Sequence, residues 1–248
     1  MSKVIYDFTG ERYVVTGASS GMGRQVALEL AESGAEVLAI ARNEERLESL
    51  KSECAERIFT ASLDVCDSES LEGAIAGFVS SHGKLDGGVH AAGIDALTPL
   101  RTYDDETARK IMDITFWAGM KLLQLITKAK YGNSGTSTVL FSSVASMSHD
   151  KGKFAYSAAK SAVNAAVCCA AKEICAKKHR VNAILPGWVA TPMTEKLGEV
   201  NDSESVAARH ILGTGKPEDV SKMVLFLLSD ASSWITGSNI VVDGGYTA

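Results

Sequence analysis

The chain has 248 residues, of which 46% are apolar, and a formal net charge of −5. This length and apolar content suffice for a sizeable core, so we expect residues 1–248 to form a single α/β domain. The acidic balance without a basic block argues against a nucleic-acid binder, and no apolar run is long enough to span a bilayer. Residues 1–3 do not lead into a signal peptide, so we expect a cytoplasmic protein with neither a nucleic-acid nor a membrane partner.

The sequence has five cysteines, an odd number, and none of them has the spacing to a histidine that a metal site needs. We therefore expect no metal site and reduced thiols at Cys54, Cys66, Cys168, Cys169 and Cys175. Prolines are few, and the sequence has no low-complexity tract and no repeat of 20–50 residues. These features show no domain boundary.

The first predicted elements are a strand, a glycine-rich turn and a helix. The apolar run at residues 12–16 predicts the strand, residues 17–23 (Gly-Ala-Ser-Ser-Gly-Met-Gly) the turn, and residues 24–33 the helix. The glycines permit a close approach of backbone to a pyrophosphate, and the helix N-terminus offers free N–H groups. This order predicts a dinucleotide site, although a tight turn without a ligand would have the same glycine spacing.

The second strand, residues 36–41, ends where a dinucleotide-binding sheet meets the adenosine ribose. An acidic residue there would bond the ribose hydroxyls and select NAD. This chain has Ala41 followed by Arg42, and a guanidinium suits a phosphate. We therefore favour NADP(H). The alternative is that Arg42 only opens the next helix as a solvated charge.

Further strands and helices alternate along the chain. Residues 56–62 predict the third strand, followed by Asp64, which either accepts a hydrogen bond from adenine or caps the helix that starts near Ser68. Residues 85–91 predict the fourth strand, and residues 104–130 one long amphipathic helix. This alternation predicts a Rossmann-like, doubly wound parallel sheet with helices on both faces. The inward positions of the long helix are Ile111, Ile114, Thr115, Ala118 and Leu122.

Ser143, Tyr156 and Lys160 are the candidate catalytic residues. Ser143 follows a buried apolar run at residues 137–141, where its hydroxyl can bond a substrate oxygen. Tyr156 and Lys160 are four residues apart, which places both on one face of a helix. An ammonium beside a phenol favours the phenolate, so we expect Lys160 to lower the pKa of Tyr156 and prepare it for proton transfer. Such a pair also arises by chance on a solvated helix face.

The last third of the chain predicts an oligomer interface and a lid. The helix at residues 154–177 is small and apolar nearly all round, so we expect a second subunit of a homo-oligomer to cover one face. Residues 181–185 predict a strand that ends in a Pro-Gly turn above the ligand crevice. Residues 191–213 are polar and weakly patterned, as is typical of a mobile lid. A helix at 220–228 and a strand at 239–242 complete the sheet.

These motifs resemble the short-chain dehydrogenase/reductase family over nearly the whole length. The family pattern Thr-Gly-x-x-x-Gly-x-Gly begins at Thr16, the Ser…Tyr-x-x-x-Lys set begins at Ser143, and the Pro-Gly turn is at Pro186. The resemblance implies a nicotinamide cofactor and homo-oligomers, tetramers or dimers, packed through the two long helices. The cofactor-binding residues it implies, together with those argued above, are Thr16, Gly17, Ser19, Ser20, Gly21, Met22, Gly23, Ala41, Arg42, Asp64, Val65, Ala91, Ala92, Gly93, Lys160, Pro186, Gly187, Val189 and Thr191.

Two positions depart from the family pattern. The family's Asn-Asn-Ala-Gly is replaced by His-Ala-Ala-Gly at residues 90–93, so the central sheet needs another brace, and we interpret His90 as a hydrogen-bonded core residue. Many members carry an asparagine in the long helix that holds a water of the proton relay behind the lysine. Thr115 stands at that position, and either its hydroxyl replaces the amide or it bonds a carbonyl one turn back.

The resulting prediction is an oxidoreductase that transfers a hydride between NADP(H) and a carbonyl or secondary alcohol, most simply an NADPH-dependent ketone reductase acting on a 3-oxoacyl or similar group. The alternatives are an NAD-dependent alcohol or sugar dehydrogenase and a cofactor-binding module without turnover. The substrate is a small molecule, and we expect residues 94–97, 147–149, 188–189 and the lid to form its pocket.

Overall fold

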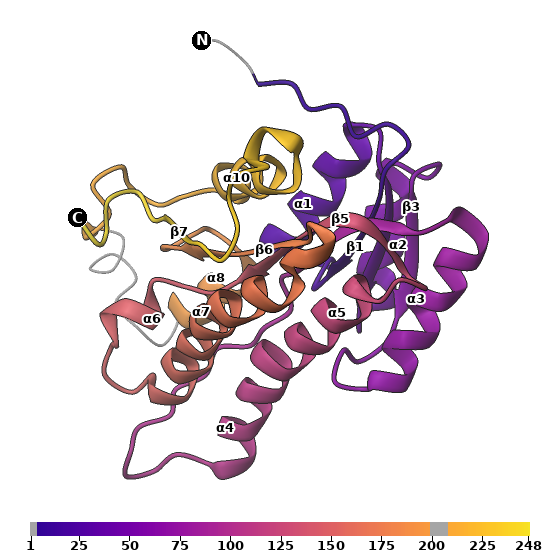
Figure 1. Cartoon of the computed structure of the whole chain (residues 1–248). Helices are drawn as coiled ribbons and strands as arrows, with labels where there is room; N and C mark the ends of the chain where they lie inside the picture. The colour runs from indigo at the N-terminus through magenta and orange to yellow at the C-terminus, as the bar shows by residue number, and fades with distance from the viewer. Residues whose placement is uncertain (1–3, 199–207) are drawn as a thin grey trace.

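The structure, a computed structural model, describes residues 4–198 and 208–248. Within these residues seven parallel strands form one sheet in the order β3-β2-β1-β4-β5-β6-β7 (Figure 1). This is the Rossmann-like, doubly wound sheet that the alternation of elements predicts. The strands are β1 (Arg12–Thr16), β2 (Glu36–Ala41), β3 (Ile58–Ser62), β4 (Leu85–His90), β5 (Gly132–Phe141), β6 (Arg180–Pro186) and β7 (Asn239–Val242).

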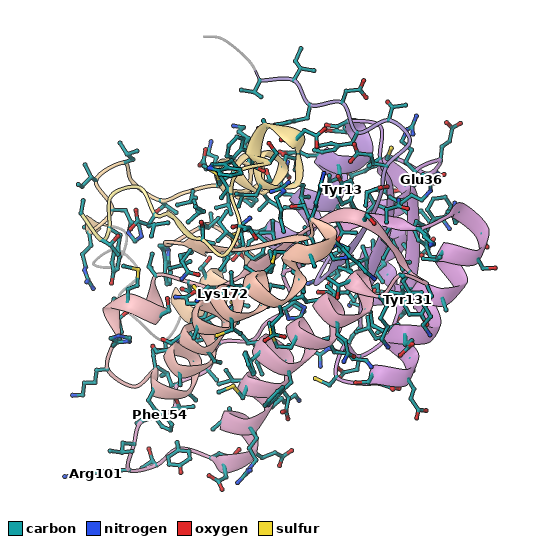
Figure 2. The ribbon with its side chains drawn as sticks, in the orientation of Figure 1. Tyr13, Glu36, Arg101, Tyr131, Phe154 and Lys172 are labelled. Carbon is teal, nitrogen blue, oxygen red and sulfur yellow. The ribbon has the colours of Figure 1, made fainter. Side chains whose placement is uncertain are left out.

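Helices cover both faces of the sheet, as Figures 1 and 2 show. One face carries α1 (Gly21–Glu32), α2 (Glu44–Glu53) and α10 (Pro217–Leu228). The other carries α3 (Ser68–His82), α4 (Asp105–Met112), the π-helix η1 (Asp113–Trp117), α5 (Ala118–Thr127) and α7 (Phe154–Ile174). Shorter helices are α6 (Ala145–Ser148), η2 (Cys175–Lys177), α8 (Pro192–Gly198) and η3 (Asp230–Ser232).

The central strands are buried on both faces, which explains why β1 and β2 have apolar residues at consecutive positions. Tyr13 and Val15 of β1 pack in the core beneath α1 and α10, whereas Val14 packs on the opposite side beneath α3 and α5. Side chains alternate across a strand, so each strand contributes to both cores. Two hydrophobic layers therefore hold the sheet in place.

The structure confirms most predicted elements and corrects two. The predicted continuous helix at residues 104–130 is wrong, because a π-helix separates α4 from α5. Its predicted inward residues are nevertheless all buried. The capping role considered for Asp64 is also wrong, because Asp67 accepts the N–H groups of Glu69 and Ser70 at the start of α3, whereas Asp64 bonds the N–H of Cys66. Part of the predicted lid, residues 199–207, lies outside the described residues.

All five cysteines are free. Among the residues that the structure describes, no cluster of three His, Cys, Asp or Glu side chains is suited to a metal ion. Over the same residues, no helix is both long and apolar enough to cross a membrane.

We predict that Gly87→Ala strongly destabilises the fold. A Cβ at Gly87, in the middle of β4, would overlap the carbonyl oxygen of Ser137 and lie 3.0 Å from the ring of Tyr13. Relief would require β4 and β5 to separate, so the free energy of unfolding should fall by more than about 3 kcal/mol. The measurement is urea unfolding followed by circular dichroism.

Gly73→Ala is the matched control. Gly73 lies in α3, and a Cβ added to it would meet no atom within 4 Å, so its replacement should stabilise the protein by about 0.5–1 kcal/mol. Equal stability of Gly87→Ala and the wild type would contradict the packing argument.

Candidate active site

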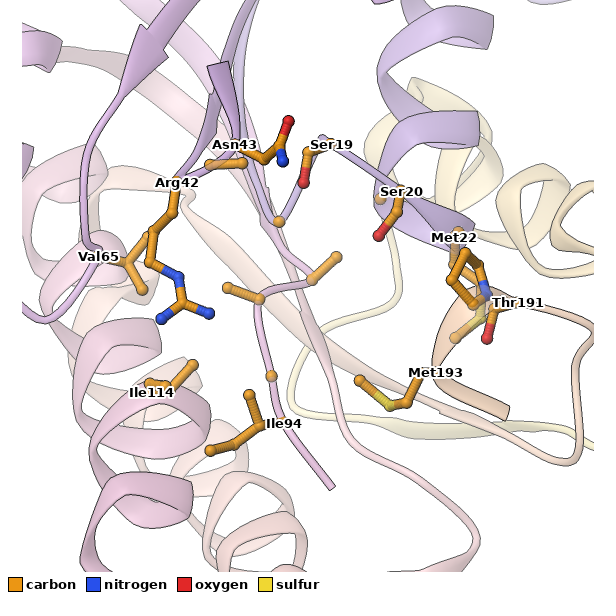
Figure 3. Close-up of a pocket in the computed structure, with 18 of the residues that line it drawn as sticks. Ser19, Ser20, Met22, Arg42, Asn43, Val65, Ile94, Ile114, Thr191 and Met193 are labelled. Carbon is orange, nitrogen blue, oxygen red and sulfur yellow. The ribbon is translucent and has the colours of Figure 1, made fainter. Parts of the chain in front are cut away.

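A cavity of about 640 Å³ lies at the carboxyl ends of the strands. β1 and β4 are neighbours at the centre of the sheet, and the chain leaves them in opposite directions, to β2 and to β5. Such a switch point opens a crevice at the carboxyl edge of the sheet, where ligands bind in this class of fold. The cavity has the size of a small-molecule or cofactor site. Figure 3 shows side chains from the ends of several strands around it.

The glycine-rich turn brings the backbone close to this cavity. Gly17 has a φ of +73°, and a Cβ there would lie 2.6 Å from the backbone nitrogen of Ala92. A Cβ on Gly23 would lie 2.5 Å from the carbonyl oxygen of Gly17. The turn is therefore as tight as a pyrophosphate cradle needs, and it leads directly into the N-terminus of α1. The shape of the turn fits a dinucleotide.

Most of the predicted cofactor residues line the cavity. They are Gly17, Ser19, Ser20, Gly21, Met22, Gly23, Ala41, Arg42, Asp64, Val65, Ala91, Ala92, Gly93 and Thr191. Thr16, Lys160, Pro186, Gly187 and Val189 do not line it. Thr16 is fully buried and bonds His90, and Val189 is buried beside Gly215. Residues that we did not assign to the cofactor also line the cavity: Asn43, Arg46, Leu63, Ile94, Asp95, Ile114, Phe141, Pro192 and Met193.

Two guanidinium groups from the end of β2 and the start of α2 reach the cavity. Arg42 is exposed, and Figure 3 shows its side chain extending towards Val65 and Ile114. Neither Arg42 nor Arg46 forms an ion pair with a carboxylate in the described part of the chain, whereas Arg24 pairs with Glu53. Arg42 precedes α2 and Arg46 lies in its first turn, so no helical spacing in the sequence relates the two side chains.

The three candidate catalytic residues come together where β5 ends and α7 begins. The Ser142 hydroxyl donates to the carbonyl oxygen of Lys160 at 3.0 Å, and the Lys160 Nζ donates to the carbonyl oxygen of Phe141 at 2.7 Å. These bonds tie α7 to the end of β5. Lys160 Nζ lies 5.5 Å from the centre of the Tyr156 ring, and the Tyr156 side chain hydrogen-bonds Ser143. Tyr156 and Lys160 therefore lie on one face of α7, as their spacing predicts.

The expected effect of Lys160 on Tyr156 is wrong in this structure. Burial raises the pKa of Tyr156, the Asp95 carboxylate raises that pKa further, and the hydrogen bond with Ser143 offsets only part of the increase. Burial also lowers the pKa of Lys160 to about 8, against a smaller opposite effect of Asp95. Both pKa shifts are towards the neutral form, because burial disfavours the charged form of each group. The phenol is thus protonated at neutral pH.

Asp95, which lines the cavity, forms an ion pair with Lys153 and acts on Tyr156. Lys153 Nζ lies 2.7 Å from the Asp95 carboxylate, and both side chains are largely buried. Burial raises the pKa of Asp95 although Lys153 opposes this shift. Thr98 forms two hydrogen bonds to residues around Lys153. Its N–H donates to the Gly152 carbonyl, and its hydroxyl accepts the N–H of Ala155. The segment after β4 is therefore anchored to the start of α7.

His90 is the hydrogen-bonded core residue that the sequence indicates. Its side chain is 1% exposed, with Nδ1 at 2.8 Å from the Thr16 hydroxyl and Nε2 at 2.9 Å from the Ile114 carbonyl oxygen. Thr115 is fully buried, and its hydroxyl has no hydrogen-bond partner among the described residues. The alternative in which Thr115 bonds a carbonyl one turn back is therefore wrong.

Comparison with known proteins gives matches along nearly the whole chain. The sequence profile of the enoyl-(acyl carrier protein) reductase family matches residues 17–247. The 3-oxoacyl-(acyl-carrier-protein) reductase FabG of Thermotoga maritima is 33% identical over 240 residues, covering 95% of this chain and 97% of that protein. The L-xylulose reductase of Caenorhabditis elegans is 30% identical over 249 residues, covering 98% of both. A solved short-chain type dehydrogenase/reductase from Mycobacterium marinum matches with a TM-score of 0.91 and 29% identity over 98% of both chains.

We predict that His90 makes the protein less stable in acid. Burial lowers the pKa of His90 to about 4, from an ordinary value of 6.5. Between these values the unfolded chain binds a proton that the folded chain does not, so this contribution to stability is lost as pH falls from 6.5 to 4. From pH 7.5 to pH 5 the wild type should lose about 2 kcal/mol more than His90→Asn, measured by urea unfolding at both pH values. A constant difference between the two proteins would contradict the shift.

Proposed function

Because the chain belongs to the short-chain dehydrogenase/reductase family and is an oxidoreductase of that family, we propose that it is an NADPH-dependent reductase of ketones that carry a 3-oxoacyl or similar group. The observation that carries this proposal is the convergence of Ser143, Tyr156 and Lys160 at the end of β5, on the same edge of the sheet as the glycine-rich turn. Relatives named 3-oxoacyl-(acyl-carrier-protein) reductase support the substrate class. A panel of carbonyl compounds, each tested with NADPH and NADH, is the direct experiment.

The proposed chemistry uses the protein as a proton donor and an orienting surface. NADPH, when bound, supplies the hydride to the carbonyl carbon. The hydroxyls of Ser143 and Tyr156 donate hydrogen bonds to the carbonyl oxygen, which orients and polarises the carbonyl. Tyr156 then gives its proton to that oxygen as the oxygen gains negative charge. The raised pKa of Tyr156 suits this direction, because the phenol holds its proton until the oxygen becomes basic.

The cofactor would lie across the edge of the sheet in a defined direction. The glycine-rich turn and the start of α1 would hold the pyrophosphate, and Asp64 with Val65 would contact the adenine. Lys160 would bond the nicotinamide ribose, with the backbone of residues 91–93 beside it. The turn formed by residues 186–191 would border the nicotinamide end.

The preference for NADPH rests on the charge at the end of β2. Arg42 and Arg46 line the cavity without carboxylate partners in the described residues, and Ala41 stands where an acidic residue would repel a phosphate. A guanidinium presents a planar set of donors that matches phosphate oxygens. Asn43 is occupied as the N-cap of α2, since its Oδ1 accepts the N–H of Arg46. The arginine side chains therefore supply the donors for a 2′-phosphate.

Two alternative functions use the same site. An NAD-dependent alcohol or sugar dehydrogenase would use the same three catalytic side chains, and the similarity to a protein named L-xylulose reductase favours testing sugars in the panel. A cofactor-binding module without turnover would follow if Thr115 failed to support proton transfer. Cofactor preference separates the first alternative from our proposal, and turnover separates the second.

A homo-oligomer is part of this proposal. α4, η1 and α5 lie beside α7 on one face of the molecule (Figure 1). Trp117 is 60% exposed on this face, and Phe154 is exposed at the start of α7. Large apolar side chains of this kind, next to a helix with small exposed residues, favour burial against a second copy, in a dimer or tetramer.

We predict that Tyr156→Phe removes turnover and leaves NADPH binding nearly intact. The change deletes the proton donor and keeps the ring, so the dissociation constant for NADPH should change by less than about twofold while kcat falls by at least about 100-fold. Lys160→Ala should weaken both, because Lys160 would also contact the ribose. Steady-state kinetics and fluorescence titration with NADPH provide the test. Turnover like that of the wild type in Tyr156→Phe would contradict the mechanism.

We predict that Arg42→Ala weakens NADPH binding far more than NADH binding. Losing a charge-assisted hydrogen bond to phosphate costs about 1.5–3 kcal/mol, or roughly 10- to 150-fold in affinity. Arg101→Ala is the matched control, because Arg101 does not line the cavity and lies on the exposed loop before α4 (Figure 2). Equal affinity of the wild type for NADH and NADPH would refute the assignment.

We predict that Thr115→Val slows turnover, with a larger effect at high pH. After each reduction Tyr156 must regain a proton, and we propose that the Thr115 hydroxyl orients a water behind Lys160 in place of the family's amide. Protons are scarce at high pH, so a weakened path limits the rate there first. Thr115→Asn should be tolerated. The pH profiles of both variants test this, with melting temperatures as a check on folding, and an unchanged profile for a folded Thr115→Val would exclude the relay.

A further inference from the structure

The π-helix leaves one backbone carbonyl without its usual helical partner. In an α-helix the N–H of Ala118 would donate to the carbonyl oxygen of Ile114, four residues back. Here it donates to Asp113, five residues back. The Nε2 of His90 instead lies 2.9 Å from the Ile114 carbonyl oxygen. The imidazole thus replaces the Ala118 amide as the hydrogen-bond partner of the Ile114 carbonyl.

The hydrogen bonds of His90 fix its protonation. A carbonyl oxygen only accepts, so Nε2 must carry a hydrogen. Burial lowers the pKa of His90 to about 4, so the ring is neutral and Nδ1 must accept the hydroxyl hydrogen of Thr16, 2.8 Å away. Thr16 ends β1 directly before the glycine-rich turn. One neutral imidazole therefore joins the cofactor side of the sheet to the π-helix.

The π-helix in turn places Thr115 beside Lys160. A Cβ on Gly93 would lie 3.7 Å from both Thr115 Oγ1 and Lys160 Nζ, so the two groups border the same small space. The Thr115 hydroxyl is buried and has no hydrogen-bond partner among the described residues. A buried hydroxyl without a hydrogen-bond partner destabilises the fold and calls for an explanation. The direction in which the Thr115 hydroxyl points depends on the register of the π-helix.

We propose that His90 is a positioning residue for proton delivery. It bonds the carbonyl released by the π-helix, keeps η1 in register, and thereby holds the Thr115 hydroxyl towards Lys160. It touches neither substrate nor the reacting atoms. This inference rests on the proposed reductase function, but the hydrogen bonds on which it depends can be tested without turnover.

Helix α5 leaves space for the His90 imidazole at Gly119. A Cβ on Gly119, in the first turn of α5, would lie 2.9 Å from Cδ2 of His90. Glycine at this position therefore lets the imidazole reach the Ile114 carbonyl, although glycine weakens a helix interior. Gly119→Ala is a second way to displace the ring without altering the histidine itself.

The first experiment is a double-mutant cycle between His90 and Thr115. His90→Phe keeps a planar ring and removes both hydrogen bonds, and it should lower kcat about tenfold at high pH, with the KM for NADPH changed by less than about twofold. In the Thr115→Val background the same change should lower kcat by less than about twofold, because the hydroxyl on which it acts is gone. His90→Asn, which keeps a donor and an acceptor, should recover most of the activity. Additive losses, or a pH profile unchanged by a folded His90→Phe, would overturn the proposal.

The second experiment tests the two hydrogen bonds of His90, to Thr16 and to the Ile114 carbonyl, which we call the clamp. Imidazole ¹⁵N shifts of wild-type protein should show a neutral His90 with hydrogen on Nε2 at pH 6, assigned by comparison with His90→Asn. Hydrogen exchange of the Trp117 and Ala118 amides should accelerate in both His90→Phe and Gly119→Ala, and not in the control Gly77→Ala, whose Cβ would meet no atom within 4 Å. Hydrogen on Nδ1, or unchanged exchange in both variants, would overturn the clamp. If the wild type reduces no carbonyl in the panel, the proposed function is wrong, and this experiment alone decides whether the clamp exists.

Discussion

The close approach of backbones at the carboxyl ends of β1 and β4 is the constraint on which the site depends. Gly17 sits against the backbone of Ala92, and Gly23 sits against the carbonyl of Gly17, with no room for a Cβ at either position. This contact forms where the strand order reverses, which is also where a parallel sheet opens a crevice. The position of the cavity and the placement of the free amides at the N-terminus of α1 both follow from that packing.

Removal from water determines the chemistry beside this crevice. Lys160 is 5% exposed, and burial lowers its pKa, while burial raises the pKa of Tyr156. These opposite shifts move the two groups apart in proton affinity, so the phenol keeps its proton and no phenolate–ammonium ion pair forms. The Asp95–Lys153 pair at the rim adds a negative charge near Tyr156 and ties the segment after β4 to α7.

A further polar connection runs through the core behind the crevice. Thr16, His90 and the Ile114 carbonyl form a chain of hydrogen bonds from β1 across β4 to the π-helix. Every member is buried, so each bond matters more than it would at the surface. This chain explains how the sheet is braced although asparagines are absent from residues 90–93. It ends at the carbonyl of the π-helix where the long helix is interrupted.

The sequence by itself determined the fold and most of the cavity lining. Alternating apolar runs and helical patterns specify a parallel sheet, and glycine spacing specifies where backbone meets ligand, because both depend on local periodicity and conformational freedom. Tertiary structure alone decided the π-helix, the cavity position of Arg46 and the pKa directions of Tyr156 and Lys160. The π-helix contacts His90, which bonds the Ile114 carbonyl from 24 residues away in sequence. The pKa shifts depend on desolvation by several elements, a quantity that no local pattern contains.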